Sequence, residues 1–85
     1  MAEKPQEIKI NPNTVVGTTY SQLVGVSVTD FDITLEFVFI NPRDKSLGQV
    51  VSRVTLPRQI GIDLANTILM TAKVHANKKK GERND

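Results

Sequence analysis

The chain has 85 residues, a mass of 9.4 kDa, a formal net charge of +2 and no cysteine. This length fits one small domain, and a chain without cysteine cannot form disulfides, zinc-thiolate sites, iron–sulfur clusters or thiol nucleophiles. No apolar run approaches the ~20 residues that span a bilayer, and the first residues lack an apolar signal stretch, so we expect a cytoplasmic prokaryotic protein.

The positive charge is concentrated at the C-terminal end. Residues 1–72 carry six Lys/Arg against seven Asp/Glu, whereas residues 73–85 carry five Lys/Arg against two acidic residues. The body of the chain is therefore nearly neutral, and the pI near 9.2 reflects the C-terminal segment. A basic groove across the folded body is not expected.

Both ends of the chain differ from its middle. Residues 1–18 are polar, contain two prolines and show little periodicity, so we expect a flexible N-terminal arm. Within this arm, the alternating segment 7–10 can form a short edge strand, which would make a fourth strand of the sheet. Residues 78–85 have no apolar side chain and are expected to form a basic disordered tail. A single domain is then predicted over residues 19–77.

Three segments of this domain alternate between apolar and polar residues, as β-strands do. The first spans residues 20–29, and a tight turn over 30–32 separates it from the second, residues 33–40. A loop over 41–48 leads to the third, residues 49–56. Consecutive strands with short connections predict an antiparallel β-meander.

One helix is predicted to follow the third strand. Pro57 ends that strand and can stand in the first helical turn, where its missing amide proton is not needed. Residues 58–77 then place apolar side chains over an arc of about 200°, wider than the stripe that one contact requires. Gly61 costs this helix about 1 kcal/mol relative to Ala, so we expect close packing there. The predicted class is α+β, a three-stranded or four-stranded meander with one C-terminal helix packed on one face.

We expect this helix to cover the face of the sheet that carries Ile33, Leu35, Phe37 and Phe39. An ordered part of about 60 residues usually needs a disulfide, a metal or an oligomer for stability, and the composition leaves the oligomer. We therefore predict a homodimer, joined through the second face of the sheet, its edge strands or the helices. The apolar residues left over for self-association or for a protein partner are Leu23, Val38, Ile40, Val51, Ile62 and Leu69.

The segments VSVTDFDITLEFVFINP and VVSRVTLP, followed by the helix, resemble the small prokaryotic domain-of-unknown-function family 3467. The resemblance covers about residues 19–74, and its more specific marks are the Asp-Phe-Asp turn, the strand around Phe37, and Arg53 shortly before the proline. Members of that family continue the helix into an aromatic and acidic end, where this chain has VHANK at residues 74–78. The resemblance implies a fold pattern and assigns no activity, cofactor or catalytic residue.

Few residues form a pattern with catalytic or ligand-binding chemistry. His75 lacks the Glu or His spacing of metal sites, so a partly buried or helix-capping role is favoured over catalysis or metal binding. Asp30 and Asp32 could hold a cation or act as acid and base, but aspartates in tight turns more often accept hydrogen bonds from backbone amides. Glu36 and Arg53 are predicted to form a cross-strand ion pair, with partner binding by Arg53 as the alternative. No nucleotide-binding loop or nucleophile motif occurs, so we expect no enzymatic activity and no cofactor or metal.

Two functions are compatible with these features. The first is a small non-enzymatic interaction protein, a homodimer that binds itself and also another protein. The alternative is a nucleic-acid-binding accessory protein, whose basic tail contacts phosphates without sequence preference. Its candidate contacts are Lys73, Lys78, Lys79 and Lys80. No aromatic residue is interleaved with these lysines to stack on bases.

Overall fold

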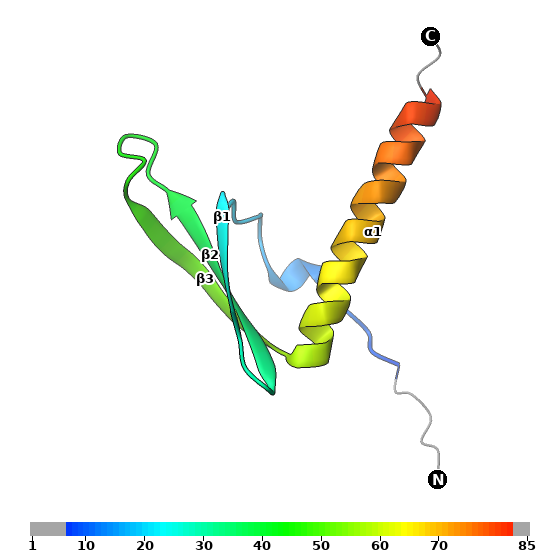
Figure 1. The fold of residues 1–85 in the computed structure, drawn as a ribbon, viewed down its shortest axis with the longest axis horizontal. Helices are drawn as coiled ribbons and strands as arrows, with labels where there is room; N and C mark the ends of the chain where they lie inside the picture. The colour runs from blue at the N-terminus through cyan, green and yellow to red at the C-terminus, as the bar shows by residue number, and fades with distance from the viewer. Residues whose placement is uncertain (1–6, 83–85) are drawn as a thin grey trace.

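The computed structural model describes residues 7–82 of the chain, with side chains through residue 79. Three antiparallel strands form one sheet in the order β1-β2-β3, and a single helix follows them (Figure 1). The elements are β1 (Leu23–Val28), β2 (Asp32–Ile40), β3 (Gly48–Pro57) and α1 (Arg58–Glu82). The predicted α+β class, a meander followed by one helix, is confirmed.

The chain before the sheet forms no strand within the described residues. A short 3-10 helix, η1 (Pro12–Thr14), begins where the Asn11 side chain accepts a hydrogen bond from the Asn13 N–H at 3.0 Å. Asparagine suits this position because its short side chain can satisfy a free amide at a helix start. Residues 7–10, the candidate fourth strand, lie outside the sheet, so the sheet has three strands here.

The side chains of the sheet alternate between two faces, and residues opposite each other in the register share a face. Val26 lies opposite Leu35, and Leu35 lies opposite Val54. We call the face with these residues the inner face, because α1 begins against it. Its apolar members are Val24, Val26, Val28, Ile33, Leu35, Phe37, Phe39, Val54 and Leu56. The opposite side is called the outer face.

A β-bulge interrupts the alternation of β3. Phe37 lies opposite Ser52, but the next residue of β2, Val38, lies opposite Val50. A bulge sets two residues of one strand against one of its partner, so Val51 is the extra residue. Unbroken alternation would place Val50 on the inner face, whereas the bulge moves it to the outer face beside Val38.

Helix α1 contacts the sheet at its N-terminal end. A Cβ atom on Gly61 would lie only 2.6 Å from the Cδ1 atom of Ile33, so the close packing predicted at this glycine is confirmed. Among the described residues, Ile33 is the one buried hydrophobic side chain, at 9% exposure. The expected helix cover is incomplete, since Leu35 and Phe37 are only half-buried and Phe39 is 37% exposed. Beyond its first turns α1 diverges from the sheet (Figure 1), and side chains of both elements remain exposed, among them Val26 at 62% and Ile68 at 57%. We call the region between these two diverging walls the V-shaped opening.

The direct junction between β3 and α1 accounts for this divergence. Pro57 is the last residue of β3 and Arg58 is the first of α1, so no loop lets the helix turn back onto the sheet. The Arg58 N–H donates to the carbonyl of Phe31 at 3.0 Å, which anchors the junction to the turn between β1 and β2. The direction of the helix is therefore set at its first residue.

The helix is also longer than predicted. We expected it to end at Asn77, and in the structure it continues to Glu82. Lysine is a good helix former, and positive side chains near the C-terminal end interact favourably with the helix dipole. The lysine run that indicated a tail therefore extends the helix.

Candidate self-association surface

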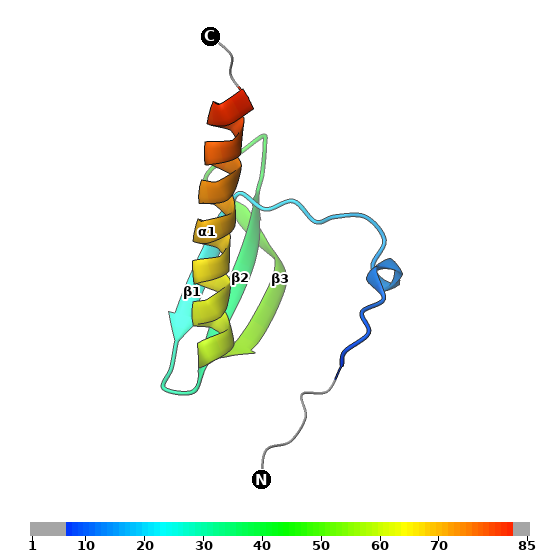
Figure 2. The ribbon, with the colours of Figure 1, turned by 90° about the vertical axis from the view of Figure 1, so that its right-hand side faces the viewer.

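The V-shaped opening has apolar side chains on both of its walls. On the sheet wall, Val26 is 62% exposed, although it points to the face on which α1 begins. On the helix wall, Ile68 and Ala72 lie on the same side of α1 as Gly61, because steps of seven and eleven residues return to nearly the same direction at 3.6 residues per turn. Figure 2 shows α1 running over the sheet along the direction of the strands, so that the two walls face each other. Each chain therefore presents two apolar surfaces that it does not cover.

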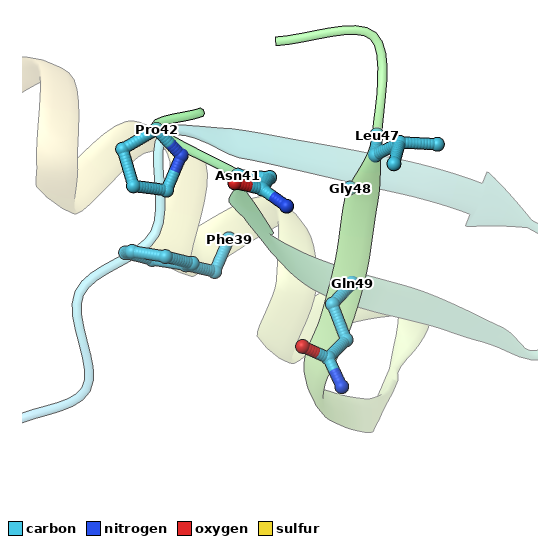
Figure 3. A pocket seen from close by; sticks show the side chains of 6 residues that line it. All are labelled: Phe39, Asn41, Pro42, Leu47, Gly48 and Gln49. Atoms are coloured by element: carbon cyan, nitrogen blue, oxygen red, sulfur yellow. The ribbon is translucent and has the colours of Figure 1, made fainter. Parts of the chain in front are cut away.

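Open hollows lie along these walls. One of about 510 Å³ is found at the far end of the sheet, where Phe39 and Gln49 are opposite residues of the register. Figure 3 shows the rings of Phe39 and Pro42 on one side of this hollow and the Gln49 side chain on the other. A smaller hollow of about 230 Å³ has Phe37 in its lining, and a shallow one of about 560 Å³ lies along α1 beside Ile68. Small-molecule sites usually enclose most of their ligand, so these open hollows fit a protein surface better.

The chain exposes far more surface than its mass requires. Its accessible surface is 8,391 Å², whereas a compact protein of this mass exposes about 5,000 Å² and one of twice the mass about 8,300 Å². The excess of about 3,400 Å² is larger than the ~800 Å² that each partner buries in a standard protein–protein interface. Part of this excess comes from residues 7–20, which lie outside the sheet and are all exposed, and part comes from the exposed apolar walls of the opening. There is therefore enough uncovered surface for a stable dimer.

Charged groups on the sheet lie on the outer face. The predicted ion pair is confirmed, since the Arg53 Nε atom lies 2.6 Å from the Glu36 Oε2 atom. Next to it, the hydroxyls of Thr34 and Thr55 are hydrogen-bonded at 2.9 Å. The register positions of the inner face hold no charged side chain. The two faces therefore differ in chemistry, and the inner face suits an apolar partner.

One carboxyl group has a perturbed pKa. In the loop between β2 and β3, the Ser46 hydroxyl and N–H both donate to the Asp44 carboxylate. These hydrogen bonds lower the pKa of Asp44 below its ordinary value, because they stabilise the charged form. The group is fully exposed and organises the loop rather than a site.

The residues that the sequence predicted for self-association fall into two groups. Leu23 lies opposite Val38 in the register, so these two share the outer face, and Ile40 follows them along β2. Ile62 and Leu69 lie together on one flank of α1, away from that group. The structure therefore does not unite them in one surface. Together with Val51, the extra residue of the bulge, these residues are spread over different surfaces of the molecule and do not form one site.

The inner-face residues were missed by the sequence analysis. Phe37 was assigned to the face that the helix was expected to cover, and Val24 and Val26 were not singled out. The signal that could have identified them is the junction at Pro57 and Arg58, which leaves no residue for a loop between strand and helix. This surface is the candidate site.

The candidate catalytic and metal-binding residues are not gathered into a site. The Thr29 hydroxyl accepts hydrogen bonds from the N–H groups of Phe31 and Asp32 at 3.1 and 3.0 Å and donates to the Asp32 carboxylate at 2.9 Å. Thr29 and Asp32 therefore build the turn together, and it is the threonine that binds the backbone amides. His75 is exposed and lies well inside α1, so the expectation that it is partly buried or caps the helix is wrong. Across the described residues, no group of three or more His, Asp or Glu side chains could hold a metal ion.

The candidate nucleic-acid contacts are spread around α1. Lys73, Lys78 and Lys79 are exposed, and at 3.6 residues per turn they point in three different directions. Lys80 belongs to the helix, but its side chain lies outside the described residues. The described lysines therefore do not form one basic face.

Comparisons with protein-family models, with curated proteins and with solved structures find no match to this chain. The resemblance to the domain-of-unknown-function family therefore stays a prediction. Within residues 7–82, α1 and η1 are not long and apolar enough to cross a membrane.

Proposed function

We propose that this chain is a small interaction module that works as a homodimer and has no enzymatic role. The observation that carries this proposal is the open apolar wall of the sheet, which leaves Ile33 as the one buried hydrophobic side chain among the described residues. A three-stranded sheet needs an apolar face packed against another layer to be stable. A single chain provides that layer only at the base of α1, so a second chain supplies the rest.

The composition leaves few other sources of stability. Without cysteine the chain has no disulfide, and small domains of this size otherwise rely on a metal or on association with another copy. Covering apolar surface stabilises by roughly 25 cal/mol for each Å² removed from water. Association through the open walls therefore supplies the missing stability without a cofactor.

A further protein partner would bind the outer face. There Leu23, Val38, Ile40 and Val50 form an apolar cluster at one end, next to the charged pair of Arg53 and Glu36. Self-association through the inner walls leaves this cluster accessible. The same chain can thus form a dimer and present a second surface.

The proposal is tested with two matched helix variants. Ile68 and Met70 are both exposed, at 57% and 67%, and lie on opposite sides of α1. We expect Ile68→Lys, which puts a charge into the opening, to weaken the dimer at least about tenfold, whereas Met70→Lys leaves it intact. The readout is the solution mass from light scattering on a sizing column, over a dilution series. Equal masses for the two variants at every dilution would contradict the proposal.

The nucleic-acid alternative stays a prediction, and the spread of the described lysines around α1 adds nothing in its favour. If the alternative is correct, binding to a nucleic acid falls steeply between low and moderate salt. The same binding would disappear when the chain is truncated after Asn77. The homodimer should be indifferent to both changes.

A further inference from the structure

We infer that the V-shaped opening of each copy is occupied by α1 of the second copy, so that two chains exchange helices across a two-fold axis. This inference rests on the proposed homodimer and adds which element fills the opening. In this arrangement the helix of one chain packs on the inner face of the other. The apolar pattern of the inner face predicts a covering helix, and in this arrangement that helix is α1 of the other chain.

The chain's own helix does not provide this cover because its base is fixed. The Arg58 N–H is bonded to the Phe31 carbonyl at 3.0 Å, directly after the last residue of β3. At Gly61, where a Cβ would meet Ile33 Cδ1 at 2.6 Å, the helix already lies as close to the sheet as it can. Closing the opening within one chain would require a bend or a loop at this junction. Between two chains no such bend is needed.

The chemistry of the opening fits a helix with a broad apolar arc. On α1 the side that holds Gly61 continues through Ala65, Ile68 and Ala72, small and apolar residues that allow close approach to a sheet. The flanks of this side carry further exposed apolar side chains, which are Ile60, Ile62, Leu64 and Leu69. An arc of this width can contact two surfaces at once, the partner's sheet and the partner's helix.

The exchange of helices also gives a closed dimer. Each copy has one uncovered sheet face and one uncovered helix, so two copies related by a two-fold axis satisfy both and leave no open end. Obligate dimers bury roughly 2,000–5,000 Å² in total, or about 1,000–2,500 Å² per chain, which is less than the excess of about 3,400 Å² that each chain exposes.

Two other arrangements compete with helix exchange. The N-terminal arm carries exposed apolar residues, among them Val15 and Val16, but η1 lies away from the opening (Figure 2). The exposed edge of β1 could instead pair with β1 of another copy, which would extend the sheet and leave the inner face uncovered. Both arrangements give a measurable difference from helix exchange.

The test is a contact measurement on a mixed dimer of the full chain. One population is labelled with ¹³C on its methyl groups and the other is unlabelled, and isotope-filtered NOEs then report contacts between copies only. We expect NOEs from the Ile68 and Leu64 methyls of one chain to the Phe37 ring of the other. Met70, on the opposite side of α1, serves as the internal control and should give none to that ring.

Each outcome decides between the arrangements. Ile68–Phe37 NOEs that are seen in the unfiltered spectrum of a uniformly labelled sample but are missing from the filtered spectrum of the mixed dimer would show a helix closed on its own sheet. NOEs from Val15 or Val16 to Phe37 would show the arm in the opening. A dimeric mass with no contact at Phe37 would show pairing through another surface. Each of these results overturns helix exchange and leaves the homodimer standing. A mass of one chain at all concentrations would instead overturn the proposed function itself.

Discussion

The two ends of the V-shaped opening differ in whether α1 of the same chain covers the apolar inner face of the sheet. At the closed end, Ile33 is covered by α1 and is 9% exposed. At the open end, Phe39 lies on the same face of the same strand and is 37% exposed. The strand pattern is equally apolar at both positions. What differs is the distance from the junction at Pro57, where the direction of α1 is fixed.

This difference shows that an amphipathic pattern and a packed core are separate properties of a chain. A pattern states which side chains need cover, whereas the connection between elements decides whether the same chain can supply it. In this protein the closed end holds the fold of one chain together. The open end is the surface that a second copy completes.

Removing the side chain that α1 covers at the closed end should have the largest effect on the free energy of unfolding. Replacing Ile33 by Ala deletes the contact with Gly61 and leaves a cavity, which we expect to lower the free energy of unfolding by about 2–5 kcal/mol. Urea denaturation followed by circular dichroism measures this change. A loss below 1 kcal/mol would mean that the base of α1 does not hold the fold together.

A charge at the open end should act on association rather than on folding. Val26 lies on the inner face and Ser27, its neighbour in β1, on the outer face. We expect Val26→Lys to weaken the dimer at least about tenfold, and Ser27→Lys to leave it nearly unchanged. Sedimentation equilibrium of both variants gives the two dissociation constants. The reverse order would place the interface on the outer face.

The closeness of helix and sheet at the closed end can be measured with Gly61→Ala. The new Cβ would lie 2.6 Å from Ile33 Cδ1 and 3.1 Å from Ile33 Cβ, so overpacking should cost more than the helix gains from alanine, with a net loss of about 1 kcal/mol. In an Ile33→Val background, which lacks the Cδ1 atom, the cost should decrease. A double-mutant cycle of unfolding free energies tests this coupling. Additive effects would exclude the contact.

The smallest effect is expected on the outer face. The side chains of the Glu36–Arg53 pair are 40% and 62% exposed, and exposed ion pairs contribute at most about 0.2–1 kcal/mol. Glu36→Gln should therefore change the unfolding free energy by less than 1 kcal/mol, and less again at high salt. It should not alter the mass of the dimer, which light scattering on the variant would show. Dissociation of the dimer in this variant would instead show that the ion pair lies in the interface.

The meander and the start of the helix were predictable from local chemistry. Alternation identified β2 because its inner residues are large and apolar, and Pro57 marked the boundary between strand and helix. Gly61 indicated close packing because a glycine inside a helix is costly unless something approaches its backbone. These features depend on neighbouring residues, which is why the sequence reveals them.

The bulge and the direction of α1 were not predictable in the same way. Val50 and Val51 are identical residues, so the sequence cannot show which of them is displaced at the bulge. Periodicity gives the apolar side of a helix but not the angle at which it leaves a strand. That angle depends on backbone geometry at Arg58 and on its bond to Phe31. The candidate site was therefore missed, although its residues were identified as apolar.

The solution mass of the wild-type chain at two widely separated concentrations shows whether a second copy covers the open end. If a second copy covers the open end, sedimentation equilibrium will give a mass near twice 9.4 kDa at the higher concentration. On dilution, the wild-type chain should remain a dimer at concentrations at which the Ile68→Lys variant is a monomer. A mass of 9.4 kDa at both concentrations would contradict the account, because the apolar walls of the opening would then remain uncovered in a stable monomer.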